Sequence, residues 1–188
     1  MPPLTARRQR PTALEASRLK VIGIVGWSGS GKTTLLTALL SKLRARGLTV
    51  STVKHAHHGF DMDRPGKDSF RHREAGAHEV LVMTGRRWAL LHEVVGPEPT
   101  LEQLLDRMAA VDLVLVEGFK THRFPKIEVH RPLLAKPPIW PEQPDIVAVA
   151  SDAPLACNRP LLPLNDPAIT AEWLLNFLHT CVAYGPCK

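Results

Sequence analysis

The segment from Gly26 to Thr33, written GWSGSGKT, matches the pattern G-x-x-x-x-G-K-[ST] in full. Its glycines let successive backbone N–H groups point inward at phosphate oxygens, and the helix that follows adds positive charge at its N-terminus. We expect Lys32 to reach the β- and γ-phosphates and the Thr33 hydroxyl to bind Mg²⁺. The segment predicts a P-loop that binds a nucleoside triphosphate through a run of nine residues: Gly26, Trp27, Ser28, Gly29, Ser30, Gly31, Lys32, Thr33 and Thr34.

The residues on either side of this motif predict a strand–helix–strand unit. Val21 to Val25 is a short apolar run, typical of a strand buried on both faces. Leucines then recur at helical spacing from Lys32 to Arg46, Gly47 follows as a helix C-cap, and Leu48 to Val53 is a second strand pattern. Such a crossover joins parallel strands. The motif thus has the context that a chance Gly/Ser-rich turn would lack.

The rest of the chain alternates between strand and helix patterns. A capping box at Thr100 and Gln103 begins one helix, and Asp166 caps another that starts at Pro167. Residues 132–144 contain five prolines and predict an irregular connection. A short helix covers 69–76, and the strand patterns cover 78–83, 87–95, 111–116, 124–130 and 146–150. We expect an α/β, P-loop NTPase three-layer fold, with a mostly parallel sheet flanked by helices and a β-hairpin extension.

Most of the net charge of +6 lies in residues 1–20, which hold five basic side chains and one acid. A nucleic-acid-binding domain would carry a basic face on its folded body, so we expect no nucleic-acid partner. We predict a disordered basic extension over 1–19, a P-loop domain over 20–180 and a C-terminal tail over 181–188. No apolar run approaches the ~20 residues of a membrane span, and no apolar stretch follows the first arginines. We expect a cytoplasmic protein without membrane contact.

A P-loop NTPase also needs an acid near its magnesium, at the end of a neighbouring strand. Glu117 follows the apolar run LVLV and is the best candidate, in place of the usual aspartate. Asp112 is the rival, but it stands at the start of the same strand, away from the carboxyl edge where ligands bind. Lys32 and Glu117 are therefore the candidate catalytic residues, and Thr33 and Glu117 are candidate metal ligands.

A polar loop follows the second strand at the same edge of the sheet. Asp61 and Asp63 are placed to bind Mg²⁺ directly or through water, with Asp61 as the preferred ligand. Lys67 is placed to contact a phosphate. Asp68 either faces the ligand or caps the helix that begins at Ser69, and both interpretations stay open.

Two groups of residues bear on a transition-metal site. The three cysteines form no CxxC pair, which predicts reduced thiols and excludes a zinc finger. His55, His57 and His58 lie close in sequence, but neighbours in an extended segment point to opposite sides. We favour contact of these histidines with a phosphate or a cofactor precursor over metal binding.

Five stretches together resemble the MobB family, the molybdopterin-guanine dinucleotide biosynthesis adaptor proteins. They are GIVGWSGSGKTTL, VKHAHHGFDMDRPGKDS, REAGA, LVLVEGFK and PKIEVHR. The resemblance runs from about Val21 to Arg131 and continues more weakly through VAVASD and LPLND. The N-terminal extension and the proline-rich connection are not part of the pattern.

This resemblance implies a homodimeric GTP-binding protein with weak intrinsic GTPase activity. It implies MobA guanylyltransferase as a partner, which joins GMP from GTP to molybdopterin. Molybdopterin or the molybdenum cofactor is implied as a further ligand, and molybdenum-insertion proteins as further partners. The P-loop would hold the phosphates, Glu117 would lie near the metal, and five loop residues would face the nucleotide or the precursor: Asp61, Asp63, Lys67, Asp68 and Ser69. Guanine specificity rests on the resemblance, because the chain has no intact N-K-x-D and only Asp152 falls in place.

Several alternatives remain open from the sequence. The histidines also fit a nickel or zinc metallochaperone GTPase, and a P-loop kinase would use an arginine-rich lid, for which Arg71 and Arg73 are weak candidates. A surface for a pterin or a partner is expected from Phe119, Lys120, Lys126 and Arg131, although core packing explains Phe119 as easily. The segment TGRRWALLHEVV forms a hairpin that is suited to pairing with a second subunit.

Overall fold

The computed structural model describes residues 20–56 and 63–180, so both predicted tails lie outside the described residues. The described residues fall into two compact units. One is the internal segment Ala56–Met108, and the other combines the chain on either side of it.

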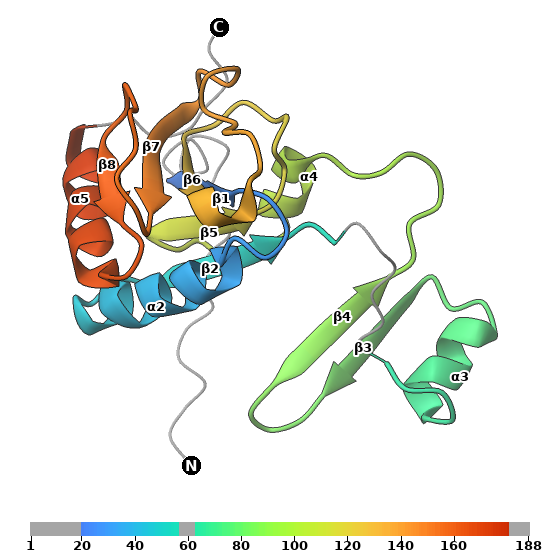
Figure 1. Cartoon of the computed structure of the whole chain (residues 1–188). Coiled ribbons are helices and arrows are strands. Elements are labelled where there is room, and N and C mark those ends of the chain that lie inside the picture. The colour runs from blue at the N-terminus through green and yellow to red at the C-terminus, as the bar shows by residue number, and fades with distance from the viewer. Residues whose placement is uncertain (1–19, 57–62, 181–188) are drawn as a thin grey trace, which may run out of the picture. The chain divides into compact units, whose positions relative to one another are not determined.

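The larger unit is built on a six-stranded sheet in the order β2-β5-β1-β6-β7-β8 (Figure 1). Every neighbouring pair in it is parallel, which confirms the predicted sheet. The edge strand β8 was not predicted, because three residues ending in a proline are too short to show a strand pattern. The strands are β1 (Val21–Val25), β2 (Val50–Lys54), β5 (Leu113–Glu117), β6 (Lys126–His130), β7 (Ile146–Ser151) and β8 (Leu161–Pro163).

Two long helices pack against each other beside this sheet, α2 (Lys32–Ala45) and α5 (Pro167–Thr180). Helix α2 ends where Gly47 takes a φ of 86°, close to the predicted end. Helix α5 begins with the predicted cap, since the Asp166 carboxylate accepts the N–H of Ala168 at 3.0 Å. The helix signals of the sequence are therefore confirmed at both sites.

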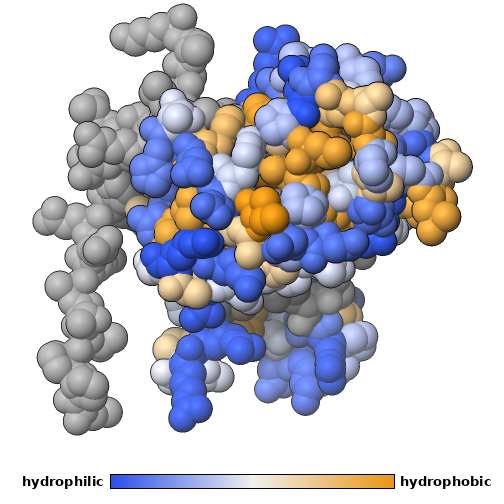
Figure 2. All heavy atoms as spheres, turned by 60° about the vertical axis from the view of Figure 1, so that its left-hand side comes forward, coloured by the Kyte–Doolittle hydropathy of each residue, from blue (hydrophilic) through white to orange (hydrophobic). Residues whose placement is uncertain are grey.

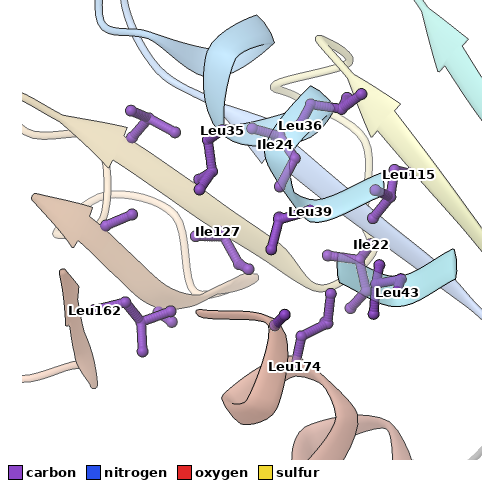
Figure 3. Packing of buried hydrophobic residues seen from close by; sticks show 14 of the residues in the cluster. Ile22, Ile24, Leu35, Leu36, Leu39, Leu43, Leu115, Ile127, Leu162 and Leu174 are labelled. Atoms are coloured by element: carbon purple, nitrogen blue, oxygen red, sulfur yellow. The ribbon is translucent and has the colours of Figure 1, made fainter. Parts of the chain in front are cut away.

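The core lies between these helices and the sheet (Figure 3). Helix α2 directs four leucines at i, i+1, i+4 and i+8 into it, and Figure 3 shows them against side chains of β1, β5 and β6. Burial of each leucine side chain stabilises the fold by roughly 1.5–3 kcal/mol relative to leaving it exposed. Seen from the side of α5, apolar residues lie between hydrophilic ones on the surface (Figure 2). A second cluster contains Val25, Trp140, Ile146 and Val149, so the connection before β7 covers sheet residues as well.

The proline-rich connection is irregular, as predicted, apart from one 3₁₀ turn, η1 (Pro132–Leu134). None of the helices in the described ranges is long and apolar enough to cross a membrane.

The smaller unit holds an antiparallel hairpin of β3 (Glu79–Met83) and β4 (Trp88–His92), which confirms the predicted extension. Helix α3 (Asp68–Glu74) contacts β3. Helix α4 (Leu101–Leu105) begins with the predicted capping box.

Candidate nucleotide-binding site

The P-loop joins β1 to α2 at the carboxyl edge of the sheet. Strand β1 is flanked by β5 on one side and β6 on the other, so chain connections diverge in both directions from this point. Open parallel sheets bind ligands at such a switch point. The sequence motif therefore stands where the fold itself favours a ligand.

The backbone of the loop requires glycine at two positions. Gly26 has a φ of 147°, and a Cβ there would meet the Ser30 hydroxyl at 2.8 Å and the Val129 carbonyl oxygen at still closer range. Gly31 has a φ of 97° and precedes α2 without a side-chain cap. The first N–H groups of α2 thus have no capping side chain, which leaves them suited to an anion.

Lys32 lies back across the loop that it follows. Its ammonium donates to the Trp27 carbonyl oxygen at 2.9 Å. Burial is the main cause that lowers the pKa of Lys32, and Lys120 and Lys54 lower it further, while Glu117 opposes them. The ammonium is therefore partly buried in the loop, with one carboxylate and two further lysines near it.

Glu117 is the last residue of β5 and faces the first turn of α2. Its two carboxylate oxygens lie 3.0 and 3.1 Å from the Thr33 hydroxyl, and the Lys54 ammonium lies 3.9 Å from one of them. Asp112 lies at the other end of β5, where it accepts the Thr49 N–H and hydroxyl at 2.7 and 2.6 Å. Glu117 therefore lies beside the P-loop, whereas Asp112 lies at the far end of the same strand. A carboxylate and a hydroxyl in contact form the oxygen set that Mg²⁺ prefers.

Arg131 supports the loop from the other side, and the sequence did not suggest this. Its Nε donates to the Ser30 carbonyl oxygen at 2.9 Å, and its Nη1 lies 3.1 Å from the Asp152 carboxylate. Knowledge of the register between β6 and β7 would have revealed the contact between Arg131 and Asp152. His130 of β6 pairs with Ser151 of β7, so the residues that follow them lie side by side. Asp152, predicted to read guanine, is engaged by this arginine.

Trp27 is fixed above two segments that are distant in sequence. Its indole N–H donates to the Pro137 carbonyl oxygen at 2.7 Å. The Lys120 and Lys136 ammonium groups lie 4.7 and 6.0 Å from its ring centroid. The proline-rich connection therefore contributes directly to the surroundings of the P-loop.

Lys126 was wrongly predicted as part of a surface. Its side chain is 1% exposed, lies over the Phe124 ring and donates to the His122 carbonyl oxygen. The cause is its place in β6, between β1 and β7. Phe119 is also buried, and its ring lies 4.7 Å from that of His55, so the core-packing interpretation is the correct one for it.

The predicted loop residues that the structure describes belong to the smaller unit. The Ser69 hydroxyl donates to the Asp63 carboxylate at 2.8 Å. Helix α3 begins at Asp68 with Lys67 as its N-cap residue, so Asp68 as the N-cap was wrong. Asp61, His57 and His58 lie outside the described residues. Within residues 20–56 and 63–180, no three His, Cys, Asp or Glu side chains form a metal-binding group.

A parallel sheet with a glycine-rich loop after its first strand, a lysine within that loop and a Thr–Glu pair beside it define a P-loop NTPase-like protein. Two solved structures share this fold. One, a MobB protein homologue from Bacillus stearothermophilus, has a TM-score of 0.62 at 27% identity and covers 86% of this chain and 99% of its own. The other, molybdopterin-guanine biosynthesis protein B, has a TM-score of 0.69 at 29% identity and covers 85% and 99%.

The family model of molybdopterin guanine dinucleotide synthesis protein B matches residues 21–152. Two relatives are molybdopterin-guanine dinucleotide biosynthesis adapter proteins. The one from Haemophilus influenzae is 44% identical over 87% of this chain and 92% of its own length. The one from Escherichia coli is 39% identical over 86% and 94%. The chain belongs to the MobB family, and the matched range extends past Arg131 to include the proline-rich connection.

Proposed function

We propose that this protein is a GTP-binding adaptor in the biosynthesis of molybdopterin-guanine dinucleotide. The observation that carries the proposal is the contact of Thr33 with Glu117, next to a P-loop that is crossed by Lys32. In this assignment the loop N–H groups and Lys32 bind the phosphates, and Thr33 and Glu117 hold Mg²⁺. Asp61 stays a predicted further metal ligand. The family and the curated relatives support the pathway.

We assign the protein a binding role with slow hydrolysis. Fast P-loop GTPases position the attacking water with a glutamine after the metal-side acid. Here Glu117 is followed by Gly118, Phe119 and Lys120, and the Phe119 ring is buried. Hydrolysis by the isolated protein should therefore fall far below the ~10 s⁻¹ typical of enzymes. A rapid steady-state GTPase rate without a partner would contradict this assignment.

The proposed partner is MobA guanylyltransferase, and molybdopterin or the molybdenum cofactor is the proposed second ligand. Molybdenum-insertion proteins would receive the product. We propose a cytoplasmic location for the protein, where GTP is available to the pathway. Adding this protein to a MobA reaction should raise the yield of molybdopterin-guanine dinucleotide. Adding the Lys32→Ala variant instead should leave the yield unchanged.

We propose a homodimer that forms through the hairpin. One face of the β3–β4 sheet presents Leu81, Met83, Trp88 and Leu90, which are 59%, 70%, 69% and 46% exposed. A two-stranded sheet is marginally stable alone, and a contiguous apolar face of this kind favours a partner. Light scattering should give twice the chain mass for wild type and the monomer mass for Trp88→Asp. A monomeric wild type would contradict the proposal.

Isothermal titration with Mg²⁺ and either GTP or ATP tests nucleotide binding directly. We expect wild type to bind GTP more tightly than ATP. Lys32→Ala should weaken GTP binding by about 2–3 kcal/mol, roughly a hundredfold, because a charge-assisted contact to phosphate is lost. Lys42→Ala is the matched control, since Lys42 is an exposed lysine on the same helix. Equal affinity for ATP would refute the GTP assignment, and an unaffected Lys32 variant would refute the site.

A further inference from the structure

Two lysines that the phosphate site does not require converge on the indole of Trp27. Lys120 comes from the turn after β5, and Lys136 comes from the proline-rich connection after β6. Within the described residues, neither ammonium lies within ion-pair distance of a carboxylate, although Lys120 interacts at longer range with the buried carboxylate of Glu128. Like charges repel, so two ammonium groups around one ring have an electrostatic cost that a bound anion would relieve.

The proline-rich connection is held firmly in place. Glu128 of β6 is fully buried and accepts the N–H groups of Ile139 and Trp140 at 2.8–3.0 Å. The indole N–H of Trp27 holds the Pro137 carbonyl oxygen from the other side. These contacts fix the backbone on the C-terminal side of Lys136 before any ligand arrives, which reduces the entropy lost on binding.

The pair of lysines extends outward from the nucleotide phosphates. Lys120 lies near enough to Lys32 to lower its pKa, whereas Lys136 makes no such contribution. Lys136 is also an exposed side chain, and Lys120 is half-buried. The two ammonium groups thus lead from the edge of the triphosphate site toward solvent.

We propose that Trp27, Lys120 and Lys136 form a second anion site beside the P-loop, which binds the phosphate group of a phosphate monoester. A phosphate monoester carries a charge near −2 at neutral pH, which is complementary to two ammonium groups. The indole N–H is engaged by Pro137, so the anion is held by the lysines, and the ring supports them by cation–π contact. This inference rests on the proposed function in one respect, that the nucleotide fills the neighbouring P-loop.

The test uses phenyl phosphate as the probe and the full-length protein, loaded with Mg²⁺ and a non-hydrolysable GTP analogue so that the γ-phosphate position is filled. Binding is followed by Trp fluorescence, with Trp27→Phe to identify the signal, and by titration calorimetry. We expect saturable binding that Lys120→Ala and Lys136→Ala each weaken about tenfold, the loss of one charge-assisted contact. Lys42→Ala should leave it unchanged. Lys136→Ala should also leave the affinity for the analogue unchanged.

A second arm needs no nucleotide and separates this inference from the proposed function. In Lys32→Ala, whose P-loop is impaired, phenyl phosphate should still bind, and adding Lys136→Ala should weaken that binding about tenfold. That result would support the second site even if GTP failed to bind wild type. Absence of probe binding in both the loaded wild type and Lys32→Ala would overturn the proposal. It would also be overturned if Lys136→Ala weakened the analogue as strongly as Lys32→Ala, because the lysine would then serve the γ-phosphate.

Discussion

Replacing Asp152 tests whether this carboxylate reads the guanine base or supports the P-loop, because the two roles predict different effects on GTP and ATP binding. The sequence suggested that this carboxylate reads the guanine base. In the structure it holds Arg131, whose Nε supports the Ser30 carbonyl of the P-loop. If the contact with Arg131 is its main role, Asp152→Ala should loosen the loop and weaken GTP and ATP alike. If base reading is its main role, only GTP binding should weaken.

The size of the effect follows from the Arg131 contacts. A hydrogen bond to a charged group contributes roughly 1.5–3 kcal/mol. The side chains of Arg131 and Asp152 are 35% and 21% exposed, so solvent screening reduces the contribution of this pair to about 1 kcal/mol. We expect Asp152→Ala to weaken both nucleotides by about fivefold, which is that energy converted to an affinity ratio.

Titration calorimetry on Asp152→Ala, Arg131→Ala and the double variant provides the assay. Because both residues act through one contact, the double variant should be little worse than Arg131→Ala alone. Glu172→Ala, an exposed carboxylate on α5, controls for the change in net charge. Strictly additive effects would refute the role of Asp152 in holding Arg131. A loss of GTP affinity without a loss of ATP affinity would also refute it, and would restore the prediction that Asp152 reads guanine.

Four further variants test other parts of the structure. Gly26→Ala should lower the free energy of unfolding by about 2–5 kcal/mol through crowding and an unfavourable φ. Gly29→Ala should cost only about 1–2 kcal/mol, since no atom lies within 4 Å of its Cβ position, and urea denaturation of both variants would show the difference. Burial raises the pKa of Glu128 above its ordinary 4.5, so the folded state binds a proton more tightly than the unfolded chain. The free energy of unfolding should therefore fall as pH rises from 4.5 through the raised pKa, and Glu128→Gln should remove that fall in urea melts across pH. Glu117→Gln should reduce the gain in GTP affinity that Mg²⁺ gives, measured by titration with and without the metal; an unchanged gain would remove Glu117 from the metal site.

The P-loop and Glu117 could be predicted because both can be recognised from short stretches of the sequence. The glycines and Lys32 are adjacent in sequence, and Glu117 ends an apolar run whose carboxyl edge is fixed by any parallel sheet. The contact between Thr33 and Glu117 then needs only that β5 lie beside β1, and it does.

Other contacts depend on register and on which strands become central, and no local pattern contains that information. Arg131 meets Asp152 because β6 and β7 align at His130 and Ser151. Lys126 has the composition of a surface residue, yet β6 has a neighbour on both sides and its lysine is buried. The prediction of Asp68 as an N-cap was wrong because α3 begins at Asp68 itself, one residue earlier than the sequence pattern suggested.

Glu128 shows why the proline-rich connection lies against the P-loop. A buried carboxylate loses hydration and costs stability unless hydrogen bonds replace the water. Here the replacement comes from the N–H groups of Ile139 and Trp140, with His130 3.7 Å away. An apolar residue in β6 would have avoided that cost but would have left those N–H groups without an acceptor. The carboxylate therefore fixes the path of the connection, and that path sets Pro137 and Lys136 against the Trp27 indole.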